Sequence, residues 1–320
     1  MKALVWNGGQ DLRHEDVVDP AAGPGVAVVS VVAAGVCGSD LHGYRGHPGP
    51  RVPPLILGHE AVVTLPGSDE RFAVFPLGLC GRCAACGRGE EQFCERRGLL
   101  GLDRPGVFAE AAAVPTDHLV ALPASLPTER AVLIEPLAVG VSAVRLDRVA
   151  AGERVLVLGA GPIGLLYALA ARAVGAEAVV ADPLPTRRRH AEELGFATTA
   201  DADDLAGDPF DVACDSVGVV ATWSAAIRRV RRGGRVGVVG LGSAVGELAV
   251  GEVVRQGITL RGHYAYSRDD FLAAAQLVAT IDLPTGWTTD YPLAEGAQAF
   301  ADLVGEPERV TKAILWTQPR

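Results

Sequence analysis

Four cysteines lie within fifteen residues of one another, at Cys80, Cys83, Cys86 and Cys94. Their spacing, C-x2-C-x2-C-x7-C, suits four thiolates around one tetrahedral Zn²⁺, with no coordination position left open for chemistry. The alternative is disulfide bonding, but pairing cysteines three residues apart strains the backbone, and no other feature of the chain indicates a secreted protein. The spacing therefore predicts a closed, structural zinc site.

A glycine-rich turn in the second half of the chain fits the dinucleotide-binding pattern G-x-G-x-x-G. The residues that we expect to contact a cofactor here are Gly159, Gly161, Pro162, Ile163 and Gly164. The pattern alone is weak, but this turn follows the strand-like ERVLVLG and opens a helix-like segment. Its glycines permit a tight turn and a close backbone approach, so that a pyrophosphate can lie at the helix N-terminus.

Asp182 ends the next strand-like segment, AEAVVAD, eighteen residues after Gly164. A carboxylate at this position would accept hydrogen bonds from the ribose hydroxyls and repel a 2′-phosphate, which favours NAD over NADP. Two observations leave alternatives open. An Asp here could simply cap the loop before Pro183, and the arginines at positions 187–189 could accept a phosphate.

The composition of the chain excludes several classes of function. With 320 residues, 49% hydrophobic and 21% charged, it matches a soluble globular protein of two domains. A net charge of -9 without a basic stripe argues against nucleic-acid binding. The apolar stretches are too short or too glycine-rich for a membrane span, and Met1 leads into the strand-like MKALVW with no secretion signal. Six cysteines then indicate metal sites and free thiols in a cytoplasmic protein.

The elements that must position these residues differ between two parts of the chain. Up to about residue 135, short strand-like runs and frequent turns predict an irregular β-barrel. From about residue 140, strand-like and helix-like segments alternate, which predicts a parallel sheet covered on both faces. Near Asp282 the turn-rich texture returns. We therefore predict one domain from 1–138 and 282–320, with a zinc lobe at about 78–98, and a second domain from 139–281.

A cysteine lobe of this spacing, followed by a dinucleotide fingerprint, resembles the medium-chain zinc-dependent alcohol dehydrogenases. The resemblance covers nearly the whole chain. It implies an α/β protein in which a GroES-like irregular β-barrel is the catalytic domain and a Rossmann doubly wound parallel sheet binds NAD. It also implies that Arg187 lies against the adenosine of the cofactor.

Two further segments look like the catalytic-zinc segments of this family: GVCGSDLH at 35–42 and GHE at 58–60. The resemblance implies a second, open zinc site that is bound by Cys37 and His59. A thiolate and an imidazole are both good zinc ligands. Glu60 follows directly and could bind the metal or exchange with water. An isolated Cys or His would more often be a core thiol or a surface imidazole, but the joint occurrence of both motifs favours a metal site.

Three neighbouring residues suit proton transfer and ligand orientation. The Ser39 hydroxyl is two residues from a zinc ligand and could take the substrate proton. By resemblance, His42 would pass that proton to solvent through the cofactor ribose, and an imidazole titrates near neutral pH as a relay requires. Asp40 would orient His59 through its other ring nitrogen.

The fourth catalytic ligand separates branches of the family. Ethanol-type members use a second cysteine, whereas this chain has Glu135 within LIEPLAV. That segment resembles the polyol (sorbitol-like) and threonine dehydrogenase branch, in which the Glu binds the metal directly or through water. One thiolate and two carboxylates make the metal site anionic, so bound water should be acidified less unless one carboxylate steps back. Such a site would suit a bidentate diol or amino alcohol.

Together these features predict an NAD-dependent zinc alcohol or polyol dehydrogenase with two Zn²⁺ per chain, one catalytic and one structural. It would interconvert a secondary alcohol and a ketone by hydride transfer, acting on a small polyol, a sugar-like cyclitol or an amino alcohol. The alternatives are a simple mono-alcohol dehydrogenase, a non-catalytic cofactor-binding protein on the same fold, or a zinc-free quinone reductase relative, which would lack the cysteine lobe.

We also expect a homodimer or homotetramer. One departure from the family bears on subunit contacts and on the shape of the site. Only nineteen residues separate Glu60 from Cys80, which is shorter than usual and predicts a shortened barrel hairpin.

Overall fold

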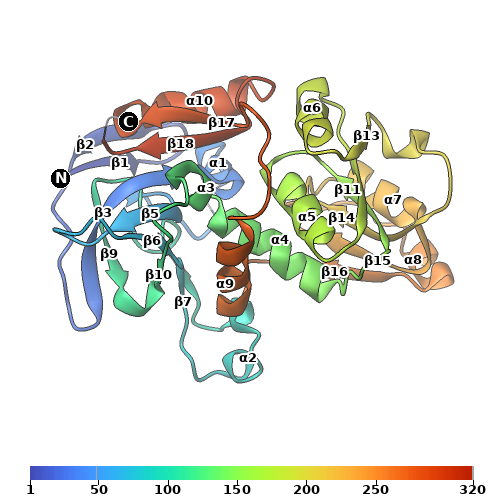
Figure 1. The fold of residues 1–320 in the computed structure, drawn as a ribbon, viewed down its shortest axis with the longest axis horizontal. Coiled ribbons are helices and arrows are strands. Elements are labelled where there is room, and N and C mark those ends of the chain that lie inside the picture. Colours follow the sequence, from blue (N-terminus) through green and yellow to red (C-terminus); the bar gives the residue numbers. More distant parts are fainter. Residues whose placement is uncertain (48, 319–320) are drawn as a thin grey trace. The chain divides into compact units, whose positions relative to one another are not determined.

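The computed structural model of the chain describes residues 1–47 and 49–318. It divides into two compact units (Figure 1). Unit 1 comprises Met1–Glu135, Ser267–Ala279 and Thr288–Arg320, and unit 2 comprises Pro136–Tyr266 and Thr280–Trp287. The C-terminal segment thus belongs with the N-terminal one. Unit 1 also includes the stretch 267–279, which lies within the range expected for the dinucleotide-binding domain.

Unit 1 is built on β-sheets that are antiparallel except for one pair of strands. Its strands are β1 (Lys2–Trp6), β2 (Leu12–Asp16), β3 (Val26–Gly35), β4 (Leu55–Ile56), β5 (Glu60–Thr64), β6 (Arg71–Val74), β7 (Leu77–Gly78), β8 (Gly98–Leu99), β9 (Ala111–Pro115), β10 (Leu119–Ala121), β17 (Thr288–Pro292) and β18 (Lys312–Trp316). The largest sheet has the order β10-β6-β5-β3-β18-β17, with β9 also on β3, and a smaller sheet has the order β2-β1-β4. Only β17 and β18 run parallel to each other. Alternate residues of these short strands point inward and form one apolar core.

Short helices complete unit 1 around this core. They are α1 (Gly38–Tyr44), α2 (Ala84–Gly87), α3 (Thr128–Ala131), α9 (Arg268–Leu277), α10 (Gly296–Gly305) and the 3₁₀ turns η1 (Glu91–Phe93), η2 (Thr116–His118) and η4 (Leu293–Glu295). Phe300 of α10 packs against the rings of Tyr44 and Phe108, at centroid distances of 5.4 and 6.1 Å. Phe271 of α9 lies edge-on to Phe75 at 5.5 Å, and the N–H of Arg268 at the start of α9 donates to Glu91, so α9 is associated with unit 1.

Unit 2 is a parallel six-stranded sheet with the order β13-β12-β11-β14-β15-β16. Its strands are β11 (Arg154–Leu158), β12 (Glu177–Ala181), β13 (Ala197–Thr199), β14 (Phe210–Asp215), β15 (Val230–Val238) and β16 (Thr259–Gly262). Its helices are α4 (Ile134–Leu146, whose first two residues belong to unit 1), α5 (Pro162–Ala173), α6 (Pro185–Glu193), α7 (Val220–Arg229), α8 (Val250–Gln256) and the turn η3 (Ala202–Asp204). The chain winds outward from β11 in one direction and from β14 in the other, so the topological switch point lies between these two strands.

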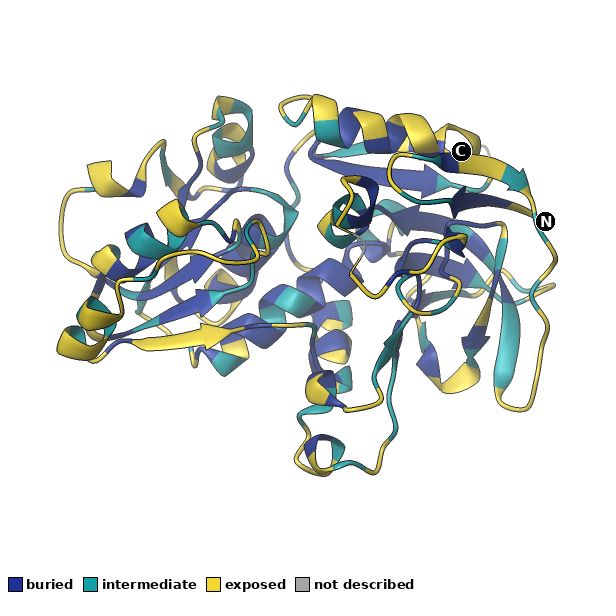
Figure 2. Cartoon of the chain, turned by 180° about the vertical axis from the view of Figure 1, so that it is seen from behind, coloured by how far each residue is buried: buried dark blue, intermediate teal, exposed yellow. Residues whose placement is uncertain are grey.

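Burial separates the middle of this sheet from its last strand (Figure 2). Strands β11 and β14 are almost wholly buried, as expected of a parallel sheet covered by helices, whereas all four residues of β16 are exposed. The predicted fold class is therefore confirmed: an irregular β-barrel unit joined to a doubly wound parallel sheet. None of the helices in residues 1–47 and 49–318 has both the length and the apolar character that crossing a bilayer requires.

Candidate functional site

The pairing of two strands assembles the candidate for the open metal site in unit 1. β3 runs antiparallel to β5 with Gly35 opposite Glu60, so the chain after β3 and the chain before β5 lie side by side. Cys37 follows β3 and His59 precedes β5. The ligand atoms of Cys37, His59 and Glu60 consequently lie within 4.8 Å of one another. The structure thus brings together three of the four residues predicted to bind the catalytic metal.

The buried polar atoms of this group fit a cation. Glu60 is fully buried, and its Oε1 finds no hydrogen-bond partner among the described residues. His59 Nδ1 is also buried without such a partner, 3.8 Å from a carboxylate oxygen of Asp40. Buried polar atoms are normally satisfied because an unsatisfied one costs free energy. A zinc ion between the thiol, the imidazole and the carboxylate would use Glu60 Oε1, while His59 Nδ1 faces Asp40.

The Cys37 thiol lies beside these carboxylates. Burial, followed by the nearby carboxylates of Glu60 and Asp40, raises its pKa to about 11. The thiol therefore keeps its proton at neutral pH unless a cation displaces it, as metal binding does. Gly35 is required next to this group, because a Cβ there would overlap the Glu60 carboxylate and lie 2.9 Å from Val132 Cγ1.

Lys312 is a functional candidate that the sequence analysis did not identify. It opens β18, is 1% exposed, and donates hydrogen bonds to the Val36 carbonyl at 2.9 Å and to Glu60 Oε2. The Glu60 carboxylate therefore has one oxygen anchored by a buried ammonium group and the other without a partner among the described residues. The one signal in the sequence was compositional, since the chain has only two lysines and this one begins the apolar strand KAILW.

The short helix α1 carries the residues predicted to move the proton. Asp40 is fully buried, and its Oδ2 accepts the N–H of Cys37 at 3.2 Å. Ser39 and His42 are half-buried on the same helix. Burial, and then the positive charges of Arg45, His47 and Arg51, lower the pKa of His42. Its imidazole is therefore neutral at neutral pH and can accept a proton.

Glu135 is not part of the ligand group in this structure. It is buried in the first turn of α4, but its carboxylate lies outside the set of atoms within 4.8 Å of one another.

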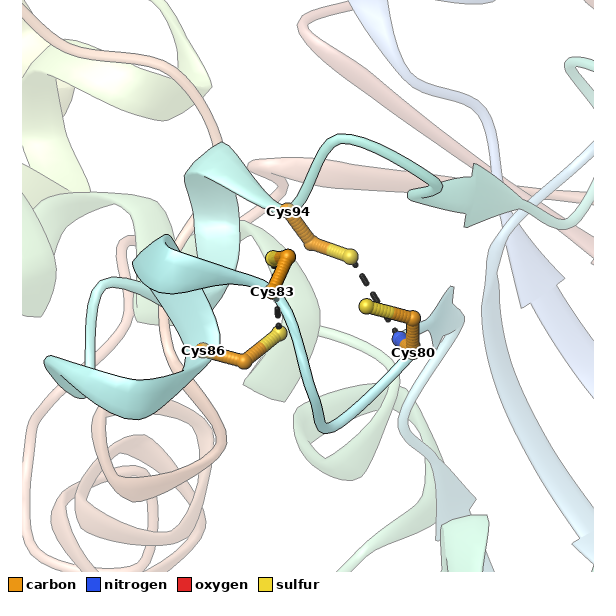
Figure 3. A group of neighbouring side chains, drawn as sticks. All are labelled: Cys80, Cys83, Cys86 and Cys94. Atoms are coloured by element: carbon orange, nitrogen blue, oxygen red, sulfur yellow. Dashed lines mark hydrogen bonds between the residues drawn. The ribbon is translucent and has the colours of Figure 1, made fainter.

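The four clustered cysteines form the second candidate metal site. Their sulfurs face a common space (Figure 3) and lie within 4.8 Å of one another. Cys83 Sγ is 3.5 Å from Cys86 Sγ, and Cys94 Sγ accepts the N–H of Cys80 at 3.4 Å. All six cysteines of the chain are free thiols, so the disulfide alternative is not realised in the structure. The arrangement fits a closed tetrahedral zinc site.

The pKa values of the cysteines in this lobe differ because hydrogen bonding and burial act on them differently. The backbone N–H of Arg82 is the main cause that lowers the pKa of Cys80 to about 6, whereas burial and then Cys83 raise the pKa of Cys86 to about 12. One sulfur of the lobe is therefore ready to bind as a thiolate, while another must lose its proton to the incoming metal.

The glycine-rich turn lies between β11 and α5 in unit 2, at the switch point of the sheet. Gly159 has φ +97°, and Gly161 is the N-cap of α5, with Pro162 and Ile163 in its first turn. A Cβ on Gly164 would overlap the Gly159 carbonyl oxygen and lie 2.7 Å from Ser216 Oγ. The turn is thus closed tightly over the helix N-terminus, which is the geometry that accommodates a pyrophosphate.

Asp182 lies at the end of β12, beside the turn. It is nearly fully buried, and its two oxygens accept the N–H groups of Ala160 and Leu184, both at 2.8 Å. It therefore performs the loop-capping role that the sequence left open as an alternative. A carboxylate has about four acceptor sites, so capacity remains for ribose hydroxyls. Arg187 lies 3.9 Å from Asp182 Oδ2.

Comparisons with known proteins agree with this geometry. Residues 23–124 match the family described as an alcohol dehydrogenase GroES-like domain, and residues 162–280 match the family described as a zinc-binding dehydrogenase. The chain is 34% identical to 2-dehydro-3-deoxy-L-galactonate 5-dehydrogenase of Pseudoalteromonas atlantica over 88% of each chain. It is 30% identical to L-galactonate-5-dehydrogenase of Escherichia coli over 98% of this chain and 96% of the relative. A crystal structure of 2R,3R-butanediol dehydrogenase from Bacillus subtilis superimposes with a TM-score of 0.87 over 99% of both chains, at 29% identity.

The buried Lys312–Glu60 pair yields a prediction about stability. Replacing Lys312 with Met leaves the Glu60 carboxylate buried without its counter-charge, so the free energy of unfolding should fall by about 3–5 kcal/mol. The double variant K312M/E60Q should recover part of this loss, because the uncompensated charge is gone. Urea unfolding measures both effects. The control is Lys2→Met, at the other lysine of the chain, whose side chain is 45% exposed and should matter little. Equal effects of the two lysine substitutions would contradict the prediction.

Proposed function

Since the chain belongs to the zinc-dependent alcohol dehydrogenase family, in its polyol branch, we propose that it oxidises one secondary hydroxyl of a polyol or sugar acid to a ketone, or catalyses the reverse reduction. The observation that carries the proposal is the buried group of Cys37, His59 and Glu60, in which a carboxylate oxygen has no partner among the described residues. The dinucleotide turn at the switch point supports the redox half of the reaction.

We propose two zinc ions per chain. One would be held by Cys80, Cys83, Cys86 and Cys94, and the other by Cys37 and His59 with Glu60 or Glu135 completing the shell. The second zinc would supply Lewis acidity to the substrate oxygen, and a nicotinamide would accept the hydride. The residues of the chain would handle the proton. Ser39 would accept it from the substrate hydroxyl, and the neutral imidazole of His42 would carry it onward.

The substrate class follows from the ligand set and from the relatives. The chain has no second cysteine for the catalytic zinc, and Glu135 stands where the ethanol-type branch has one. The relatives named above act on galactonates or on 2R,3R-butanediol, all of which carry hydroxyls on neighbouring carbons. A second oxygen beside the reacting hydroxyl would fix the substrate by chelation and orient it for hydride transfer. We therefore place vicinal polyols and sugar acids ahead of simple alcohols.

We further propose a cytoplasmic homo-oligomer. Two sets of free thiols that bind metal suit a reducing compartment. Strand β16 ends the parallel sheet with all four residues exposed, Leu260 among them at 39%, and Val254 of the preceding helix α8 is 72% exposed. Exposed strand edges tend to pair with another chain, so a second copy at this edge is the occupant we propose.

Light scattering should give at least twice the mass of one chain, and Val254→Glu should lower the measured mass. A monomeric wild type would refute the proposal.

A substrate panel tests the proposed function directly. We expect kcat/KM for vicinal diols and sugar acids to exceed that for ethanol and longer mono-alcohols by tenfold or more, because one additional well-placed contact contributes about 1.4 kcal/mol. Glu135→Ala should reduce turnover or occupancy of the open zinc site while leaving the four-cysteine site loaded. Better activity on mono-alcohols, or an unimpaired Glu135→Ala enzyme, would remove the basis for the substrate class.

A second prediction concerns the choice of NAD over NADP. Asp182→Ala removes both a ribose acceptor and a negative charge that repels a 2′-phosphate, so it should weaken NAD binding and reduce the discrimination against NADP. Because Asp182 also accepts the Ala160 and Leu184 N–H groups, Asp182→Asn is the matched variant that keeps part of this hydrogen bonding and removes the charge. Fluorescence titration with both cofactors measures the change. A wild type that prefers NADP would overturn the assignment.

A further inference from the structure

We infer that Arg51 is a positioning residue of the open metal site, which holds the Asp40 carboxylate against the backbone of one metal ligand and the imidazole of another. The inference rests on the metal centre proposed above. Arg51 was not singled out by any sequence motif and lies outside the 35–42 and 58–60 segments.

The first observation is the burial of a permanent charge. The Arg51 side chain is 3% exposed, although its neighbours in the loop between α1 and β4 are mostly exposed. A guanidinium cannot lose its charge in a protein, so it is buried only where its donors are satisfied and a counter-charge is present. Here the counter-charge is Asp40, whose side chain is fully buried and whose Oδ1 lies 3.4 Å from Arg51 Nη2.

The second observation is that the guanidinium joins separate segments of unit 1. Its Nε donates to the carbonyl of Gly101 at 3.3 Å, fifty residues away in the chain, and Nη2 also lies 3.5 Å from the hydroxyl oxygen of Ser39. The stem of Arg51 passes close to α1 at Gly43, where an added Cβ would lie 3.3 Å from Arg51 Cδ. The fork of donors on Arg fits such a multiple contact, and a lysine could not reproduce it.

The third observation is the position of Asp40 between two proposed ligands. Its Oδ2 accepts the backbone N–H of Cys37 at 3.2 Å, and its Oδ1 lies 3.8 Å from His59 Nδ1. The carboxylate therefore touches the Cys37 backbone and faces the His59 ring with different oxygens. Arg51 is held to the Gly101 loop and contacts Oδ1, so it restricts the direction in which that oxygen can move. Without it, the buried carboxylate would lose its counter-charge, and the oxygen that faces the His59 ring would no longer be held in place.

The contacts with Asp40 distinguish Arg51 from an arginine that contributes only to the stability of the fold. Outer-shell groups that orient a metal-binding histidine typically change metal affinity or activity by 10–100-fold. Arg71 offers the matched control in the same unit. Its guanidinium donates to Thr128 Oγ1 at 2.7 Å and to the carbonyls of Ala124 and Leu126 at 2.9 and 2.7 Å, and these contacts involve none of the proposed ligands.

The test compares Arg51→Met, Arg51→Lys and Arg71→Met in the full chain, loaded with zinc or cobalt. Competition with a chromophoric chelator measures the affinity of each metal, and the visible spectrum of Co²⁺ distinguishes a four-thiolate site from a site with one thiolate. We expect Arg51→Met to weaken the open site by 10–100-fold and leave the four-cysteine site unchanged. Arg51→Lys should recover part of the affinity, and Arg71→Met should lower the melting temperature without affecting either metal. Steady-state kinetics should show lower kcat in both Arg51 variants.

The outcomes separate this inference from the proposed function. If the wild type binds only one metal ion per chain, the proposed open site itself fails. If the wild type binds two and Arg51→Met holds both with unchanged affinity, only the role of Arg51 is refuted. An Arg71→Met variant that loses the open-site metal to the same degree would reduce Arg51 to a general contributor to folding. Should Arg51→Met not fold, Arg51→Lys decides: a specific loss of open-site affinity at unchanged melting temperature supports the inference, and wild-type affinity overturns it.

Discussion

The group of Cys37, His59 and Glu60 depends on a one-residue irregularity in strand β3. The pairing of β3 with β5 shifts register between Val31 and Ala33, so that one extra residue, Val32, lies in β3. Without this bulge, Gly35 would lie opposite His59; with it, Gly35 lies opposite Glu60. A one-residue shift moves side chains to the other face of a strand, so the bulge decides which residues meet at the end of β3. Thr317, just after β18, donates its backbone N–H to the Val32 carbonyl at 3.3 Å and thereby ties the bulge to the C-terminal strand.

The C-terminal strand β18 also brings Lys312, one of two buried cations that compensate the negative charge of the site. Each of the two carboxylates beside Cys37 and His59 has a buried cation of its own: Lys312 for Glu60 and Arg51 for Asp40. Counting only the thiolate of Cys37 and the carboxylates of Glu60 and Glu135 around a zinc ion gives an anionic centre, which would acidify a bound hydroxyl weakly. The two cations make the surroundings of the metal less negative than that count suggests. The Lewis acidity of a zinc ion bound there would therefore depend on side chains that do not bind the metal, because charges act over several ångströms in a buried site.

The parts of the molecule that sequence patterns could predict are those in which the chemistry is local. The four cysteines and the glycine-rich turn each lie within a short stretch, so their spacing nearly determines their geometry. Lys312 and Glu60 are 252 residues apart, and Arg51 contacts a carbonyl fifty residues away. Such contacts come from strand pairing and loop packing, and a single sequence carries no spacing for them. Asp182 is an intermediate case. Its position indicated the ribose, but only the structure reveals its hydrogen bonds to the Ala160 and Leu184 N–H groups.

The short segment between Glu60 and Cys80 could have weakened the barrel, and its packing explains why the sheet persists. β5 and β6 pair in register, with Val63 opposite Phe72, and the loop between them spans only residues 65–70. A short loop costs less closure entropy than a long one, so the pairing is not penalised. Phe75, just after β6, is fully buried, and its ring lies 5.5 Å from those of both His118 and Phe271. The chain therefore reaches the cysteine lobe from an anchored position, and the paired strands β3 and β5 that position Cys37 and His59 are both present.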